Sequence, residues 1–374
     1  MLELADIFRV AGPTYRAAHA GRLLPSHGRA MDDIVRCRTA ALGGCVYQCD
    51  ACGTQDYAYH SCRNRHCPKC QADRAHAWLS GVRARLLPCD HYLLTFTLPQ
   101  ELRAVARAHQ KPVYAALLQE AAAAVQTLAA DPAWVGGRVG MLAVLHTWTR
   151  TLEYHPHAHL LVTAGGLTRD GAGWITPAHA RFLMPGYILS ALFRAKMRDA
   201  LTHAGLADQI PSAVWNRRWA VHVQQIGRGD HAVRYLARYV FHVALTNARL
   251  TRFAHGQVTF TYTHARTQTT RPLTLPVDAF IARFLQHVVP RGFTKIRYFG
   301  LLSASCRTKR DHARALLQLH APPDVRPALV AAEACVAGTP STGAVPHPTT
   351  RQCPTCHRGQ LQLIARLGRP RAPP

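Results

Sequence analysis

Acidic residues are scarce in this chain of 374 residues, which has 20 Asp and Glu against 45 Lys and Arg and therefore a formal net charge of +25. An enzyme that acts on small acids rarely carries so strong a positive field, whereas a phosphate polymer is its natural counterion. The charge balance therefore makes nucleic acid the expected partner.

Long apolar runs are also missing. No stretch approaches the roughly 20 apolar residues that a membrane-spanning helix needs. The first residues, MLELADIFRV, mix acids into apolar positions where a signal peptide has a basic flank. We therefore expect a cytoplasmic protein. In that reducing compartment, the 12 cysteines, seven of them between Cys37 and Cys70, indicate metal ligation and argue against disulfides.

The hydrophobic pattern predicts a mixture of strands and helices without an internal repeat. Strands are expected at 91–98, 140–145, 157–162, 219–225 and 258–262. Helices are expected over 74–87, 101–128, 186–206 and 230–245. Residues 1–36 show only short amphipathic patterns, and the Pro-, Thr-, Gly- and Ser-rich stretch 338–350 indicates a linker to a basic end that we expect to be disordered.

Two Cys-x-x-Cys pairs, Cys49/Cys52 and Cys67/Cys70, predict a zinc site. A gap of two residues lets both thiolates of a pair face one ion, and two pairs complete the tetrahedron that Zn²⁺ prefers. The alternative is a set of buried reduced cysteines, which pack like small hydrophobic residues. A site with all its positions filled by protein ligands is structural.

A second four-ligand set is interleaved with the first, so a module with two zinc ions is reasonable. Its candidate ligands are Cys37, Cys45, Cys62 and His66, with His60 as a rival to His66. The sequence does not tell which ligand joins which ion. Basic side chains lie among these ligands, and either they contact DNA phosphates or they form an ordinary solvated surface: Arg63, Arg65 and Lys69.

A histidine pair, His157-Ala158-His159, lies in a predicted strand. Side chains two residues apart on a strand point to the same side, so both imidazoles are expected to emerge together. Such a pair suits a divalent ion that binds a scissile phosphate. The spacing alone is weak evidence, because the chain has 23 histidines and an H-x-H motif can arise by chance. A third ligand is expected, and the candidates are left unranked: His222, Gln224, Gln225, Glu153 and His146.

Two tyrosines, Tyr235 and Tyr239, are four residues apart in a predicted helix, with Arg234 and Arg238 at the same spacing beside them. Residues four apart are neighbours on one helical face. A phenol is a poor nucleophile until a metal polarises the phosphate and a cation favours the phenolate. The alternative is an aromatic pair packed on the core.

Taken together, these motifs resemble the two-tyrosine HUH transposases of rolling-circle insertion sequences, the insertion sequence 91 family. The resemblance covers most of the chain and depends on four segments in this order: CRTAALGGCVYQCDACG with SCRNRHCPKCQ, HYLLTFTLP, LHTWTRTLEYHPHAHLLV, and YLARYVFHVALTNARL.

The resemblance implies that His157 and His159 hold Mg²⁺ or Mn²⁺ and that Tyr235 and Tyr239 are the nucleophiles. It implies an α+β fold, with an RNA-recognition-like HUH palm of antiparallel sheet and helices on one side, preceded by a zinc-binding domain. FTLP is expected on the first strand of that palm. Cys45 departs from the pattern, because a histidine is expected at its position.

The C-terminal pair Cys353/Cys356 resembles a terminal knuckle of relatives, but no second pair follows it, and only Cys306 and Cys335 remain nearby as partners. We therefore expect three parts: 1–88 with the zinc-binding domain, 89–310 with the catalytic transposase domain, and 311–374 with a helix, a linker and a basic tail carrying a lone CxxC.

The function that follows is a metal-dependent single-strand nickase and strand transferase working through 5′-phosphotyrosine intermediates. Its expected partners are single-stranded DNA or hairpin ends of its own element and target DNA. Two alternatives stay open: a replication initiator or relaxase with the same core, and a zinc-dependent DNA-binding regulator whose nuclease core is unused.

Overall fold

The computed structural model describes residues 1–70, 78–79, 81–179, 181–228, 244–319 and 351–369. The chain divides into two compact units. One unit comprises residues 1–73, 245–288 and 338–374, and the other comprises 74–244 and 289–337. None of the described helices is both long and apolar enough to cross a membrane.

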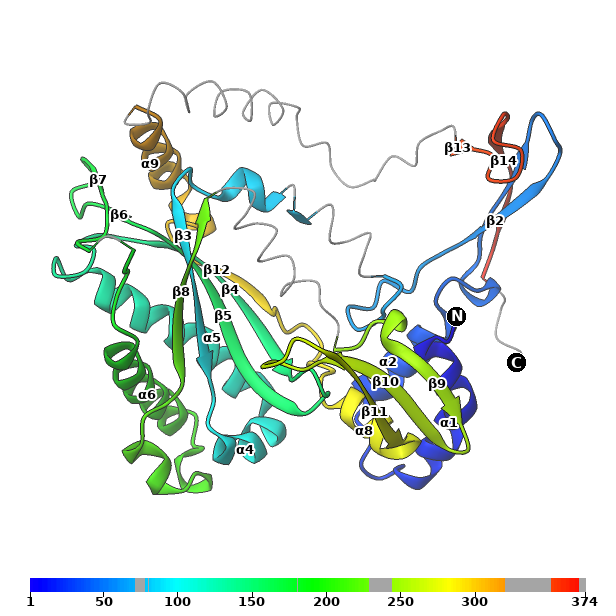
Figure 1. Ribbon diagram of the computed structural model, residues 1–374, viewed down its shortest axis with the longest axis horizontal. Coiled ribbons are helices and arrows are strands. Elements are labelled where there is room, and N and C mark those ends of the chain that lie inside the picture. The colour runs from blue at the N-terminus through cyan, green and yellow to red at the C-terminus, as the bar shows by residue number, and fades with distance from the viewer. Residues whose placement is uncertain (71–77, 80, 180, 229–243, 320–350, 370–374) are drawn as a thin grey trace. The chain divides into compact units, whose positions relative to one another are not determined.

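The second unit is built on a five-stranded antiparallel sheet (Figure 1). In spatial order its strands are β12 (Ile296–Gly300), β4 (Gly140–Trp148), β5 (Tyr154–Thr163), β3 (Asp90–Thr97) and β8 (Val221–Arg228). The expected strand that holds FTLP is β3, between β5 and β8. Strands β4 and β5 are consecutive in the chain and pair directly, as a short connection between antiparallel strands favours.

Helices cover one face of this sheet. They are α4 (Arg103–Ala108), α5 (Gln110–Ala129) and α6 (Gly186–His203), and their apolar sides pack on alternate strand residues such as Leu94, Ala143 and Leu160. Side chains at the positions between these point to the other face, where Leu93, Val144 and other apolar residues form a smaller cluster. The two-residue strands β6 (Gly166–Leu167) and β7 (Trp174–Ile175) and the helix α9 (Arg307–Leu319) complete the unit.

The first unit contains three helices and two sheets among its described residues. Helices α1 (Leu4–Ala18), α2 (Pro25–Arg36) and α8 (Val277–Leu285) accompany the antiparallel sheet of β9 (Leu250–Ala254), β10 (Gln257–Thr263) and β11 (Thr270–Pro276). Phe8 of α1 packs edge-on against Phe284 of α8, with ring centroids 5.5 Å apart. The short amphipathic patterns of residues 1–36 are therefore two full helices whose apolar sides gain partners from a distant segment.

The other sheet of this unit joins the two ends of the chain. Its order is β13 (Arg351–Gln352), β14 (Gln360–Leu367), β1 (Gly44–Cys49) and β2 (Gln55–Tyr59), all antiparallel. The register runs from Gly44 opposite Leu367 to Cys49 opposite Leu361. The expectation of a disordered basic end is therefore wrong for residues 357–369, because the backbone groups of β14 are paired in this sheet.

One helix expected from the sequence is two in the structure, and two others lie partly or almost wholly outside the described residues. The single helix expected over 101–128 is interrupted at His109, where φ is −120° and ψ is 52°, so that α4 and α5 are separate. Of the helix expected over 74–87, residues 78–79 and 81–85 are helical, and the rest of its first half lies outside the described residues. The helix expected over 230–245 lies almost wholly outside them.

Candidate functional site

Three histidines converge on the face of the second unit's sheet opposite α4, α5 and α6, which we call the histidine face. The pairing of β4 with β5 sets His146 opposite His157 and Val144 opposite His159. Paired residues on adjacent strands share a face, and so do residues two apart on one strand, so all three rings emerge together. Their candidate ligand nitrogens all lie within 4.8 Å of one another.

Hydrogen bonds fix two of these rings. The Nδ1–H of His157 donates a hydrogen bond to the backbone carbonyl of His155 at 2.7 Å. In the neutral ring, Nε2 is therefore unprotonated and able to ligate a metal. Nδ1 of His159 lies 3.0 Å from the hydroxyl of Thr95 on β3, which is opposite His159 in the register. Outer partners of this kind set the tautomer and orientation of ligating imidazoles.

Burial keeps the cluster neutral. Desolvation is the main cause that lowers the pKa of His157 to about 4 and that of His159 to about 3. His146 is also buried and stacks on Trp148 with ring centroids 4.7 Å apart. At neutral pH the rings of His157 and His159 are therefore uncharged, as metal ligation requires.

The sequence left the third ligand open, and of the candidates the structure places His146 beside the pair. His222 is exposed and lies on β8 opposite Thr95, one strand beyond His159. It lines a cavity of about 370 Å³ with Thr95, Thr97 and Arg218. Glu153 does not belong to the histidine group, and Gln224 and Gln225 lie on β8 opposite Leu93 and Tyr92. His146 was the hardest to choose from sequence, because only the β4–β5 register shows that it faces the pair.

Cysteines form two further groups in the first unit, each with four thiols. The first is Cys37, Cys62, Cys67 and Cys70, in which Cys37 Sγ and Cys62 Sγ each lie 3.5 Å from Cys70 Sγ. Thiolates around a tetrahedral Zn²⁺ with bonds of about 2.3 Å are roughly 3.8 Å apart, so this spacing fits one ion. Hydrogen bonding among the thiols, led by that from Cys62, lowers the pKa of Cys37 to about 7.

The second group joins the two ends of the chain. It is formed by Cys49, Cys52, Cys353 and Cys356, with Sγ–Sγ distances of 3.7 Å from Cys49 to Cys356 and from Cys52 to Cys353. A Cβ at Gly359 would approach Cys49 Sγ to 2.5 Å, so only glycine fits beside the group. Hydrogen bonding with Thr54 is the main cause that lowers the pKa of Cys52 to about 6.

The expectation that the two knuckles complete one tetrahedron is therefore wrong. Cys49/Cys52 and Cys67/Cys70 belong to different groups, and Cys45 and His66 belong to neither. The CxxC of the tail is not alone, because the pairing of β14 with β1 brings it to Cys49 and Cys52. Spacing along the chain identified the knuckles but carries no information about which distant knuckle completes a tetrahedron.

The expected DNA-binding residues have different environments. Arg63 is exposed and has a positive φ of 56°, whereas Arg65 is half-buried. The ammonium of Lys69 is ion-paired with Glu3 Oε2 at 2.5 Å, an interaction that the sequence did not suggest. Four further predicted residues lie outside the described part of the chain: Arg234, Tyr235, Arg238 and Tyr239.

Comparison with known proteins bears on this arrangement. A family described as "Putative transposase" matches residues 140–310, which include the histidine group, and a transposase zinc-binding domain matches residues 7–98. No solved structure matches. The zinc-domain match and the two four-cysteine groups agree on Zn²⁺ as the metal of the cysteine sites.

Two curated relatives match over much of their length. "Putative transposase y4qJ" of Sinorhizobium fredii is 35% identical over 97% of this chain and 94% of its own length. The transposase for insertion sequence element IS801 of Pseudomonas savastanoi pv. phaseolicola is 30% identical over 72% of this chain and 68% of its own. Both relatives and both family models are transposases, whose substrate is DNA. The chain therefore belongs to the IS91 family of rolling-circle insertion-sequence transposases.

Proposed function

We propose that this transposase nicks single-stranded DNA at an HUH-type site built on the histidine face of its five-stranded sheet. The observation that carries the proposal is the convergence of His146, His157 and His159, with ring centroids 4.8 to 5.4 Å apart. Three ligands leave coordination positions free for a substrate, as in catalytic metal sites.

The residues fit a divalent cation held by three imidazoles. A bound Mg²⁺ or Mn²⁺ supplies Lewis-acid polarisation of the scissile phosphate. Among the described residues, the group contains no carboxylate. Imidazole favours later transition metals, whereas carboxylate and water favour Mg²⁺. We therefore expect Mn²⁺ to bind more tightly than Mg²⁺.

Chain length permits the two tyrosines to reach this face. Strand β8 ends at Arg228, and His222, which is opposite Thr95, lies six residues earlier on the strand, about 20 Å away at ~3.3 Å per residue. Tyr235 and Tyr239 follow Arg228 by seven and eleven residues. Seven extended residues span up to about 24 Å, which covers the distance.

In the proposed reaction, the phenol oxygen of Tyr235 or Tyr239 attacks phosphorus. The new bond joins tyrosine to the 5′ phosphate, the bond from phosphorus to the 3′ oxygen breaks, and that oxygen becomes a 3′ hydroxyl with a proton from solvent. The phenol proton is released to solvent, favoured by Arg234 and Arg238. The phosphotyrosine bond conserves the energy of the broken phosphodiester, so the strand can be transferred to the second tyrosine or to target DNA.

The zinc-bearing first unit has a separate proposed role. Its structural ions hold a surface that recognises hairpin or other end structures, with Arg63 and Arg65 contacting phosphates. The ion pair of Lys69 with Glu3 makes that lysine the weakest of the three candidates, since a phosphate must compete with a carboxylate.

The adduct is the direct test. A single-stranded oligonucleotide carrying the element's terminal sequence is labelled at its 3′ end and incubated with the transposase and Mn²⁺. The label should then migrate with the denatured protein, whereas the same oligonucleotide labelled at its 5′ end should release a free fragment. Tyr235→Phe with Tyr239→Phe should remove the adduct and keep DNA binding. An adduct that survives this double substitution overturns the proposal.

A further inference from the structure

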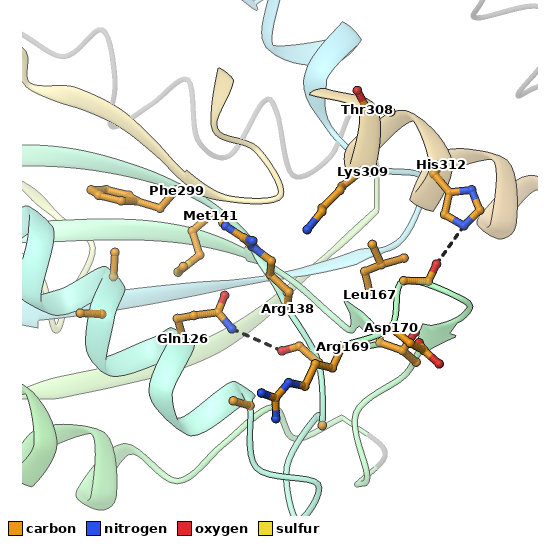
Figure 2. A pocket seen from close by; sticks show the side chains of 18 of the residues that line it. Gln126, Arg138, Met141, Leu167, Arg169, Asp170, Phe299, Thr308, Lys309 and His312 are labelled. Atoms are coloured by element: carbon orange, nitrogen blue, oxygen red, sulfur yellow. Dashed lines mark hydrogen bonds between the residues drawn. The ribbon is translucent and has the colours of Figure 1, made fainter. Parts of the chain in front are cut away.

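A cavity of about 860 Å³ lies in the second unit, away from the histidine group. Its walls come from α5, the end of β12, the loop after β6 and the first turns of α9 (Figure 2). Met141, near the start of β4, lines the cavity and packs on the side of the sheet that α4, α5 and α6 cover. His146 lies toward the other end of β4, on the histidine face. No residue of the proposed chemistry lines the cavity.

Cations dominate the polar lining. Arg138, Arg169 and Lys309 are exposed, and none of the ion pairs found in the described ranges involves them. Figure 2 shows Arg138 and Lys309 extending into the same space from different walls. The single lining carboxylate, Asp170, is engaged in its own loop, where Oδ1 accepts a hydrogen bond from the backbone of Ala172 at 3.0 Å.

The remaining lining suits a flat, partly apolar group. Phe299, Met141 and Leu167 are among its apolar lining residues. The amide of Gln126 donates to the carbonyl of Gly137, and its buried Oε1 has no hydrogen-bond partner among the described residues. Cations, an aromatic ring and an amide acceptor together match the phosphate, the base and the base edge of a nucleotide.

A second cavity lies next to this site at the β12 edge of the sheet. It has about 560 Å³, shares Phe299 with the first and is lined by Arg85, Lys111 and Arg297 without any acidic side chain. It follows β12, an edge strand of the sheet. Ile296 in its lining lies opposite Val144, which in turn lies opposite His159. A cation-lined path therefore runs along β12.

We propose that the 860 Å³ cavity binds a nucleotide of single-stranded DNA, which leaves the histidine face along the edge of β12 and inserts a base beside Phe299. The volume is within the range of small-ligand sites and admits one or two nucleotides, not a duplex. The DNA substrate follows from the family, and the direction of the path rests on the proposed nickase function.

Photocrosslinking locates the base directly. A 12-nucleotide oligo(dT) in which one thymine is replaced by 5-iodouracil is bound to the full-length transposase in EDTA. The complex is irradiated and then digested with trypsin. We expect a crosslink on Phe299, in the tryptic peptide YFGLLSASCR (residues 298–307), with fragmentation separating Phe299 from Tyr298. Crosslinks confined to other peptides overturn the proposal. Full competition by millimolar dTMP or inorganic phosphate also overturns it, since the site then binds a free nucleotide or anion.

Salt dependence tests the binding of phosphates by the cavity's cations. On a single strand, the slope of log affinity against log salt has a magnitude of about 0.7 for each phosphate that the protein neutralises, so Arg138→Ala with Lys309→Ala should lower that magnitude by about 1.4. Lys196→Ala with Arg198→Ala is the matched control, because both residues are on α6 and line neither cavity. Equal slopes for the two double variants contradict the proposal.

Phe299→Tyr should retain binding of the oligonucleotide and Phe299→Leu should weaken it about tenfold, because only the aromatic ring can stack on a base.

These binding measurements need no cleavage. If they succeed while the tyrosine-dependent adduct fails, the nickase function falls and the nucleotide site stands. If the adduct forms while crosslinks are confined to other peptides, the nickase stands and the cavity does not bind the strand.

Discussion

The histidine group and the second cysteine group differ in how the chain brings their ligands together. His146, His157 and His159 come from two strands that are consecutive in the chain, so one hairpin register assembles them. Cys49 and Cys356 are 307 residues apart and meet only because β14 pairs with β1. Local periodicity therefore predicts two ligands of the first set, His157 and His159, and only half of the second set.

The two groups also differ in what their ligand numbers permit. Four thiols fill the coordination sphere of Zn²⁺ and make a closed site, whereas three imidazoles leave it open. Replacing a ligand of a cysteine group should therefore destabilise the fold, and replacing ligands of the histidine group should abolish DNA cleavage.

The largest expected effect is the loss of one zinc ion from Cys353→Ser. Structural zinc contributes about 10–16 kcal/mol in zinc-finger peptides, and three ligands hold it far less well than four. The zinc content measured by plasma mass spectrometry should fall from two ions per chain to one. Cys45→Ser is the matched control and should keep both ions. If Cys45→Ser loses zinc and Cys353→Ser does not, the grouping of the cysteines is wrong.

His157→Ala with His159→Ala should reduce formation of the protein–DNA adduct by about 10³-fold or more, because Lewis-acid stabilisation contributes several kcal/mol. Adduct yield with the 3′-labelled oligonucleotide gives the readout. Zinc content should stay at two ions per chain. Equal loss of zinc in this variant would mean that the two kinds of group are not independent.

His91 is a buried histidine outside the ligand group, and it should make stability depend on pH. Desolvation lowers its pKa to about 4 from 6.5, so the unfolded chain binds a proton between these values that the folded chain does not. Its contribution is complete above pH 6.5 and is lost as pH falls toward 4, by at most about 3 kcal/mol.

Urea unfolding of the full chain at several pH values measures this effect. His91→Leu should flatten the decline between pH 6.5 and 4 relative to the natural chain, while exposed His222→Leu should leave it unchanged. An identical decline in His91→Leu would refute the assignment.

The smallest effect concerns Thr95, which contacts His159 but not the proposed metal. Thr95→Val should weaken Mn²⁺ binding 10- to 100-fold, because outer partners of metal-bound histidines contribute that much. Thr95→Ser keeps the hydroxyl and should restore affinity. Calorimetric titration with Mn²⁺ compares the three proteins, and equal affinities would remove Thr95 from the site.

The sequence predicted the elements with strong periodicity. The strands expected at 91–98 and 157–162 are β3 and β5 within a few residues, because their apolar runs pack on helices whatever the register. Strand β12 went unpredicted, since Ile296–Gly300 is short and half-buried, with no apolar run. His157 and His159 were found from spacing, whereas His146 and the cysteine pairing depend on registers that a single sequence does not encode locally.

The proposed chemistry is tested most directly by mass spectrometry of the trapped adduct. Trypsin cleaves after Arg234 and Arg238, so Tyr235 falls in YLAR and Tyr239 in YVFHVALTNAR, and the two tyrosines are read separately. We predict a nucleotide phosphate on one or both of these peptides, formed in Mn²⁺ and not in EDTA. A modification on any other peptide, or none in a preparation that binds the oligonucleotide, would contradict the account.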